Sequence, residues 1–257
     1  TIELINFMTK PYVKQTIENN ISFIEFYHPS HNSLPGDILQ QLVDLIKNAG
    51  DNEDVKVIVL KSGGERTFCA GASFTELANI SDEDSGKTFF SGFANVMNAM
   101  RTCPKFIIGR VQGKTVGGGI GLAACSDYCM ATKYAEIKLS ELNIGIGPFV
   151  VGPAIERKIG LSALSQISID ASTFYSASWA KQKGLFTQVY DNITELDLAV
   201  KDLATQLCSY NLEAMKEMKK MFWRGTDHWD HLLAEQAQIS GRLVLSNFTK
   251  EKLRKFK

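Results

Sequence analysis

The feature that most constrains this chain is a glycine run, in which four of the five residues 117–121 are glycine. The apolar residues 106–111 before it are typical of a buried strand, and residues 122–125 after it are typical of the start of a buried helix. Backbone N–H groups at a helix N-terminus have no intrahelical partner and favour negative charge. Because glycine has no Cβ atom, a ligand oxygen can approach the N–H groups of this run closely. The run therefore predicts a backbone site for an anionic oxygen.

A second glycine turn, Phe-Cys-Ala-Gly-Ala-Ser-Phe at residues 68–74, follows the strand-like residues 55–61. Two such turns can each direct one N–H group to the same point. Paired N–H donors form an oxyanion hole, in which each donor supplies about 3–4 kcal/mol of transition-state stabilisation. The two turns together predict chemistry that passes through an enolate or a tetrahedral oxyanion.

Several motifs occur here in one order: the turn at 68–72, the glycines at 117–119, Asp127 and the Leu-Ser-Glu-Leu-Asn-Ile-Gly-Ile-Gly-Pro segment at 139–148. With residues 32–34 and 180–185, they resemble the crotonase (enoyl-CoA hydratase/isomerase) superfamily from about Ile21 to the C-terminus. The resemblance implies an acyl-CoA thioester substrate, with coenzyme A as part of the substrate and no other cofactor. It maps the two oxyanion-hole N–H groups onto Ala72 and Gly118. The other substrate-binding candidates are Ala70, Gly71, Ser73, Phe74, Gly117, Gly119 and Gly121.

The chain alternates strand and helix patterns, which predicts an α/β protein with a largely parallel sheet. Expected strands cover residues 21–27, 55–61, 106–112 and 127–131, and an expected helix covers 36–48. The resemblance refines this to the crotonase (ClpP-like) fold, a spiral of stacked ββα repeats. We expect residues 1–193 to form this core with the acyl-CoA site.

Residues 194–257 have a helical pattern, with helices expected at 194–208, 212–222 and 227–246. The resemblance implies that this region mediates assembly into a homotrimer or a dimer of trimers. An apolar cluster here indicates core or subunit interface, and its members are Met215, Met218, Met221, Phe222, Trp223 and Trp229.

Two polar segments allow opposing interpretations. The acidic residues 80–86 are expected to form a flexible connection over the acyl pocket. This connection either shapes the pocket or is a solvated loop without a role in binding. The basic tail at 250–257 is typical of a solvated helix end. The resemblance keeps Lys252, Phe256 and Lys257 as candidates for contact with a neighbour's coenzyme A.

Charge and composition exclude several classes of function. Lys plus Arg equals Asp plus Glu at 28 each, so no global field attracts nucleic acid or an anionic membrane. No apolar stretch approaches the roughly 20 residues of a transmembrane helix, and no secretory signal is visible, so we expect a cytoplasmic protein. The five scattered cysteines predict reduced thiols, and neither they nor the four histidines have metal-ligand spacing, so no metal is expected.

Glu141 is the candidate for proton transfer. The side chains around it in sequence, Leu139, Leu142 and Ile144, are apolar, so its carboxyl group is expected to be desolvated with a raised pKa. The resemblance matches it to the family's second catalytic glutamate.

The pattern departs from two-glutamate hydratases at Gly121, where those enzymes carry the glutamate that activates water. Ser73 also replaces the aspartate usual after the Ala-Gly-Ala turn. The segment around Leu-Ser-Glu and the Phe-Val-Val-Gly-Pro at 149–153 is similar to bacterial 3-methylglutaconyl-CoA hydratases. We therefore rank an enoyl-CoA hydratase first, with Glu141, or Glu76 in addition, compensating for the missing carboxylate.

Two alternatives remain open. A Δ3-Δ2-enoyl-CoA isomerase needs only Glu141, which takes a proton from Cα and returns it at Cγ. A non-catalytic acyl-CoA-binding scaffold would explain the loss at Gly121 but not the retention of Glu141, Ala72 and Gly118.

Overall fold

The computed structural model describes residues 10–254. Its centre is a six-stranded sheet in the order β1-β2-β4-β7-β9-β11, in which β1 is antiparallel to β2 and the other neighbours are parallel. Strands β4 and β7 are mostly apolar along their length, as expected of strands covered on both faces. Their bounds are β1 Tyr12–Glu18, β2 Ile21–Tyr27, β4 Val57–Ser62, β7 Phe106–Val111, β9 Tyr128–Thr132 and β11 Gln188–Tyr190.

Short strands form a second layer, as the sheets β10-β8-β5 and β3-β6. Four times along the chain a strand of the large sheet is followed by a short strand and then by a helix, which is the predicted stacked ββα spiral. The short strands are β3 Ser33–Leu34, β5 Thr67–Cys69, β6 Gly71–Ala72, β8 Lys114–Val116 and β10 Ile137–Lys138.

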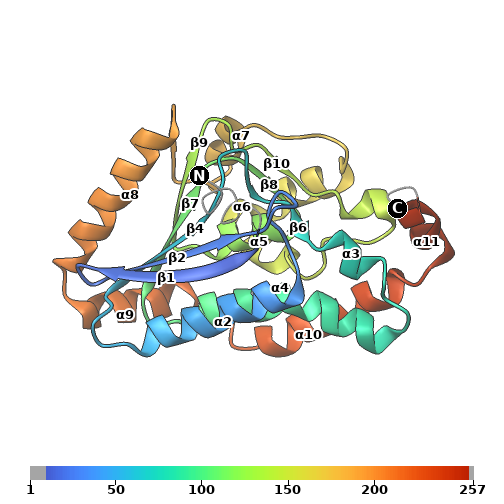
Figure 1. Ribbon diagram of the computed structural model, residues 1–257, viewed down its shortest axis with the longest axis horizontal. Coiled ribbons are helices and arrows are strands. Elements are labelled where there is room, and N and C mark those ends of the chain that lie inside the picture. Colours follow the sequence, from blue (N-terminus) through green and yellow to red (C-terminus); the bar gives the residue numbers. More distant parts are fainter. Residues whose placement is uncertain (1–9, 255–257) are drawn as a thin grey trace.

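Helices cover the sheets on the outside (Figure 1). In α2, Ile38, Leu42 and Ile46 recur every four residues and are buried, so this helix presents one apolar face to the core. The helices before residue 190 are α2 Gly36–Asp51, α3 Phe74–Leu77, α4 Glu83–Thr102, α5 Gly118–Cys125, the 3₁₀ helix η1 Glu141–Ile144, α6 Gly152–Ile169 and α7 Ala177–Gln182.

The C-terminal helices pack on this core. Leu196, Val200 and Ala204 of α8 form a second hydrophobic cluster with the face of the large sheet. The expected helices at 194–208 and 212–222 agree with α8 and α9, whereas the third ends at Leu243 and is followed by a further helix over the tail. The bounds are α8 Ile193–Cys208, α9 Leu212–Phe222, α10 Trp229–Leu243 and α11 Asn247–Arg254.

Within the expected apolar cluster of α9 and α10, Met215 and Trp229 are buried. Met218, Met221 and Phe222 are exposed large apolar residues of this chain. They fit the interface that the resemblance implies, which stays a prediction.

The expectation of a flexible connection over residues 80–86 is wrong, because the segment begins α4. Asp82 Oδ1 accepts from Ser85 N–H at 2.7 Å and Ser85 Oγ accepts from Asp82 N–H at 3.3 Å, a capping box. Glu83 and Asp84 follow in the first turn, where the helix dipole favours negative charge. The acidic residues therefore start a helix.

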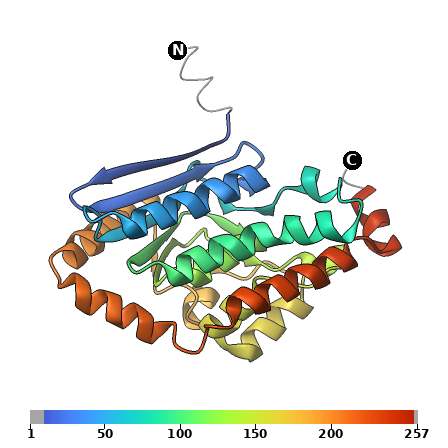
Figure 2. The ribbon, with the colours of Figure 1, turned by 90° about the horizontal axis from the view of Figure 1, so that it is seen from below.

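Helices α4 and α10 run side by side (Figure 2) and meet at two glycines. A Cβ atom built on Gly86 would lie 2.7 Å from the Cα of Gly241, and one on Gly241 would lie 2.7 Å from the backbone N of Lys87. No side chain fits between the two backbones. The position of α4 is therefore fixed by α10.

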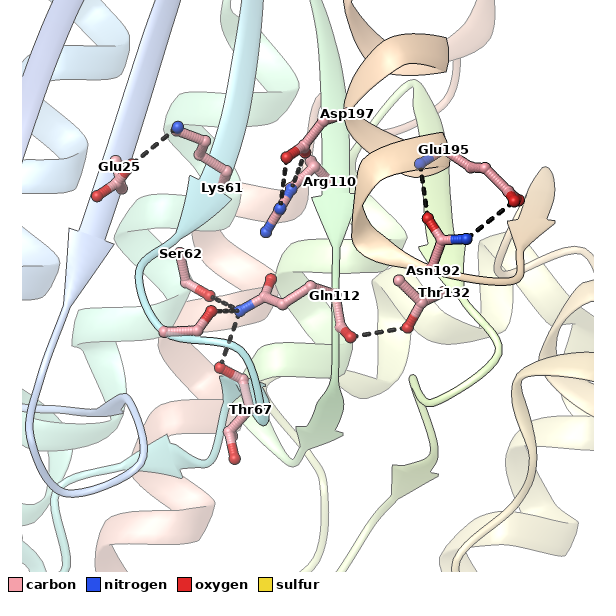
Figure 3. Close-up of polar contacts among 11 residues, drawn as sticks. Glu25, Lys61, Ser62, Thr67, Arg110, Gln112, Thr132, Asn192, Glu195 and Asp197 are labelled. Atoms are coloured by element: carbon pink, nitrogen blue, oxygen red, sulfur yellow. Dashed lines mark hydrogen bonds and ion pairs between the residues drawn. The ribbon is translucent and has the colours of Figure 1, made fainter.

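The end of β7 is tied to its neighbours by Gln112 (Figure 3). Its Nε2 donates to Ser62 Oγ at 2.9 Å, to the Gly64 carbonyl at 3.0 Å and to the Thr67 carbonyl at 3.2 Å. Thr132 Oγ1 donates to the Gln112 carbonyl oxygen at 2.7 Å. One buried amide thus fixes the loop that leads into the second glycine turn.

All five cysteines carry free thiols, and four of them are buried. Burial raises the pKa of the thiols of Cys69, Cys125 and Cys129 to about 12, so they are inert core groups.

Across residues 10–254, no three or more His, Cys, Asp or Glu side chains gather where they could hold a metal ion. No helix in the same range has the length and apolar character needed to cross a bilayer.

Candidate active site

The two glycine turns meet at one cavity of about 100 Å³. Ala70, Gly71 and Ala72 line it from the second turn, and Gly117 and Gly118 line it from the glycine run. Segments that lie far apart in the sequence are thus brought together, as the pattern of two inward-directed turns predicts.

The glycine run is the N-terminus of α5, with Gly117 as its N-cap at φ +53°. L-residues rarely adopt this conformation, so glycine is required. A Cβ atom on Gly118 would lie 2.5 Å from the ring of Phe93, so this position also needs glycine. Gly118 is the first helical residue, whose N–H has no partner four residues earlier within the helix.

The second turn is held against the first. Gly71 has φ +88°, and a Cβ atom there would lie 3.7 Å from the backbone N of Gly118. Ser33 Oγ donates to the Ala72 carbonyl oxygen at 2.8 Å, and Gly71 N–H donates to Cys69 Sγ at 3.4 Å. These contacts fix the turn, so that Ala72 and Gly118 face the same cavity.

Glu141 lies at the start of η1, against the glycine run. A Cβ atom on Gly117 would be 2.9 Å from Glu141 Oε1. The residue is half-buried, but Oε2 is out of contact with water and has no hydrogen-bond partner. Burial raises the pKa of this carboxyl group to about 7, although the N–H groups of Glu141 and Ser140 act in the opposite direction. A carboxyl group with such a pKa can both take and return a proton at neutral pH.

The space at Gly121 is filled by apolar side chains. A Cβ atom there would lie 2.8 Å from Val151 Cγ1 and 3.0 Å from Met97 Sδ. A side chain at residue 121 would therefore need Val151 or Met97 to shift, and the glycine present supplies no carboxylate.

Glu76 cannot replace it in this arrangement. Its carboxylate accepts from Gly36 N–H, at 3.0 Å to Oε2 and 3.3 Å to Oε1, and Glu76 lies outside the cavity lining. It holds the N-terminus of α2.

Three candidate substrate-binding residues lie behind the cavity surface. Ser73 Oγ accepts from Glu76 N–H at 3.3 Å and caps α3, while Gly119 packs on Cys69 and Gly121 on Val151. Phe74, in contrast, lines the cavity. Ser140 and Ser240 also line it but were not among the candidates. Ser240 comes from α10, and nothing in its local sequence marks it.

Residues 250–254 of the basic tail belong to α11, which contacts η1. Phe248 and Thr249 lie against Gly145, where a Cβ atom would approach the Phe248 ring to 2.6 Å. Lys252 Nζ lies 5.3 Å from the centroid of the Phe248 ring. Phe256 and Lys257, the other candidates for contact with coenzyme A, lie outside the described residues.

The family model described as enoyl-CoA hydratase/isomerase matches residues 16–256. This chain belongs to the enoyl-CoA hydratase/isomerase family. The predicted membership of the crotonase superfamily is thereby confirmed, and the family's acyl-CoA chemistry agrees with a cavity built from two backbone turns and one buried carboxyl group.

Relatives in the family have different activities in their names. A peroxisomal Δ(3,5)-Δ(2,4)-dienoyl-CoA isomerase of Arabidopsis thaliana is 26% identical over 77% of this chain and 76% of its own length. A short-chain-enoyl-CoA hydratase of Clostridium acetobutylicum is 25% identical over 93% of this chain and 92% of its own. The mitochondrial methylglutaconyl-CoA hydratase of Homo sapiens is 28% identical over 76% of this chain, which spans only 58% of that protein.

The predicted fold is confirmed by solved structures. The crystal structure of an enoyl-CoA hydratase from Bacillus halodurans superposes with a TM-score of 0.87 at 19% identity, covering 95% of this chain and 99% of that one. At this identity the likeness shows the fold and leaves the reaction open.

Proposed function

We propose that this protein is a single-carboxylate enzyme that moves the double bond of an enoyl-CoA thioester from C3 to C2. The observation that carries the proposal is the carboxyl group of Glu141, which lines the cavity and whose Oε2 is buried without a hydrogen-bond partner. Among residues 10–254 it is the one ionisable side chain that lines the cavity. A reaction that needs one proton-transfer group fits this site best.

In the proposed mechanism, the thioester oxygen accepts from the N–H groups of Ala72 and Gly118. The Glu141 carboxylate takes a proton from C2 of a 3-enoyl thioester, and the electron pair of that C–H bond passes into the dienolate held by the two N–H donors. The new C2=C3 bond forms as C4 takes the proton back from the Glu141 carboxyl group. The proton is returned, so no water or other reactant is consumed.

Hydration of a 2-enoyl-CoA, which the sequence ranks first, becomes the second candidate. The names of several relatives favour it, including those of the short-chain-enoyl-CoA and methylglutaconyl-CoA hydratases. In this chain Glu141 alone would have to activate water and deliver the proton, because residue 121 is glycine and no second ionisable side chain among residues 10–254 lines the cavity. The single ionisable group is the reason for placing isomerisation first.

The test is to incubate the protein separately with crotonyl-CoA, 3-methylglutaconyl-CoA and 3-hexenoyl-CoA, and to read product mass and retention by liquid chromatography–mass spectrometry. We expect a retention shift at unchanged mass from the 3-enoyl thioester, which disappears in Glu141→Gln. A gain of one water from a 2-enoyl thioester, with no isomerisation, would make the enzyme a hydratase. Binding of every thioester without turnover would leave an acyl-CoA-binding scaffold.

Three further expectations are part of this proposal and rest on the family resemblance. They are coenzyme A as part of the substrate with no additional cofactor, assembly into a homotrimer or dimer of trimers, and a cytoplasmic location.

A further inference from the structure

We propose that the acyl group this protein accepts is short and uncharged, and that Phe89 is the wall that limits its length. The inference rests on the proposed function only in taking the cavity as the acyl site. It holds equally for isomerisation and hydration, because it concerns the part of the substrate beyond the reacting carbons.

The lining of the cavity has no positive charge to receive a second carboxylate. Within residues 10–254, the side chains that surround it beyond the two turns and Glu141 are aliphatic or aromatic, apart from the hydroxyl groups of Ser140 and Ser240. A carboxylate buried without a cationic partner is strongly destabilised. The negative form of Glu141 would repel it further. Substrates with an acidic tail, such as 3-methylglutaconyl-CoA, do not fit this environment.

Phe89 separates this cavity from a second hollow. The same side chain also lines a groove of about 520 Å³ between α2, α3 and α4, whose lining is mixed and includes Gln40, Ile80 and Asn95. The acyl cavity itself is about 100 Å³. The Phe89 ring packs edge-on against Phe90, with centroids 5.0 Å apart and planes at 88°. A long acyl chain would need Phe89 to move before it could reach the groove.

On the side of the cavity opposite Phe89, no cationic side chain of residues 10–254 belongs to the lining. Phe149 lines both the acyl cavity and a groove beside α6 and α10 that contains Arg157. The Arg157 guanidinium donates to the Phe222 and Arg224 carbonyl oxygens and lies 5.7 Å from the centroid of a Trp223 ring. Arg157 thus bonds with the C-terminal end of α9, and it lines the groove but not the acyl cavity.

The charge of the acyl group is tested with pentanoyl-CoA and glutaryl-CoA, which have five acyl carbons each and differ by a terminal methyl or carboxylate. Neither has a double bond, so titration calorimetry measures binding whether the enzyme is an isomerase or a hydratase. We expect glutaryl-CoA to bind on the order of a hundredfold more weakly. Equal or tighter binding of glutaryl-CoA would overturn the inference. Failure of both thioesters to bind would instead overturn the acyl-CoA site, and with it the proposed function.

The wall is tested by comparing pentanoyl-, octanoyl- and dodecanoyl-CoA in the parent, Phe89→Ala and the matched control Phe174→Ala. Phe174 is 38% exposed and does not line the cavity. We expect at least tenfold tighter binding of dodecanoyl-CoA in Phe89→Ala, with pentanoyl-CoA within about threefold, and no change in the control. Phe89→Leu keeps an apolar side chain if the alanine variant fails to fold, and should show a smaller gain. An unchanged length profile in a folded Phe89 variant would contradict the assignment.

Discussion

Asp127 and Glu141 both have carboxyl oxygens shielded from water, and the surroundings of the two groups are opposite. Asp127, with a side chain 5% exposed, has Lys219 Nζ at 2.9 Å and accepts from Ile107 N–H at 2.7 Å and from Trp223 Nε1 at 3.1 Å. Glu141 has an oxygen with no partner at all. One carboxylate is fully bonded, whereas the other is left free to react.

The different surroundings of the two groups show which residue of the family motif has a structural role and which is suited to catalysis. Asp127 joins the start of β7 to α9, because Lys219 also donates to the Lys105 carbonyl at 2.7 Å. Its ion pair with Lys219 would be lost if its charge changed. Glu141 can change charge without breaking any bond at Oε2. Both residues belong to the motif that identifies the family, yet only Glu141 suits proton transfer.

The largest effect should come from removing the acid/base group. Glu141→Gln keeps size and polarity but cannot exchange a proton, so kcat should fall by about 10²–10⁴-fold on the thioester that the parent converts. Binding of pentanoyl-CoA should stay within a few-fold. The measurement is product formation by chromatography together with calorimetric binding, and a variant with more than half of the parent kcat would show that Glu141 is not the base.

Loss of the bonded carboxylate should affect stability instead. Asp127→Asn leaves the buried Lys219 ammonium without its counter-charge, which should lower the free energy of unfolding by about 3–5 kcal/mol. Urea denaturation followed by circular dichroism measures it. At a temperature where the variant is folded, kcat should be near that of the parent, and a loss like that of Glu141→Gln would remove the distinction between the two groups.

The pH dependence of stability should also separate them. The pKa of Glu141 is about 7 in the folded protein against 4.5 for a free glutamate, so the native state binds its proton more tightly than the unfolded chain does. This contribution is complete below pH 4.5 and is lost as the pH rises through 7, which destabilises the parent by up to about 3 kcal/mol. Glu141→Gln should therefore be the more stable protein at pH 8. Parallel stability curves for the two proteins between pH 5 and 8 would exclude the raised pKa.

The smallest effect is expected at Glu76, the third carboxylate considered for the chemistry. It accepts from the Gly36 N–H outside the cavity, so Glu76→Gln should cost about 1 kcal/mol of stability or less and leave kcat within about twofold. Thermal unfolding and the product assay test this. A tenfold loss of kcat would bring Glu76 back as a group that activates water.

Local patterns predicted much of this molecule. The apolar run at residues 21–27 is a strand with the expected bounds, the strand expected at 106–112 ends one residue earlier, and the glycine run begins α5. These segments could be predicted because burial and φ requirements leave a signal in a few adjacent residues. The spiral arrangement came from the resemblance, since successive repeats share no sequence that the eye can match.

What the sequence could not predict depends on distant packing. The acidic, polar residues near 82 predict a loop, but their charges suit the start of a helix whose main packing partners, α10 and α2, lie far from it in the chain. The preference for isomerisation over hydration also depends on packing that the sequence does not show. Gly121 shows in the sequence that a carboxylate is absent, whereas only the structure shows that Glu141 is the one ionisable side chain among residues 10–254 that lines the cavity.

The close approach of Gly86 and Gly241 also has a consequence for biosynthesis. Helix α4 carries Phe89, Phe90 and Phe93 of the acyl cavity, yet it is held by a helix that lies far later in the chain. On the ribosome, the strands of the large sheet emerge and can associate long before α10 does. Until then the face of α4 that α10 covers is open to water and to other apolar surfaces. The lining of the acyl pocket is complete only once α10 has been synthesised, because Ser240 of that helix is part of it.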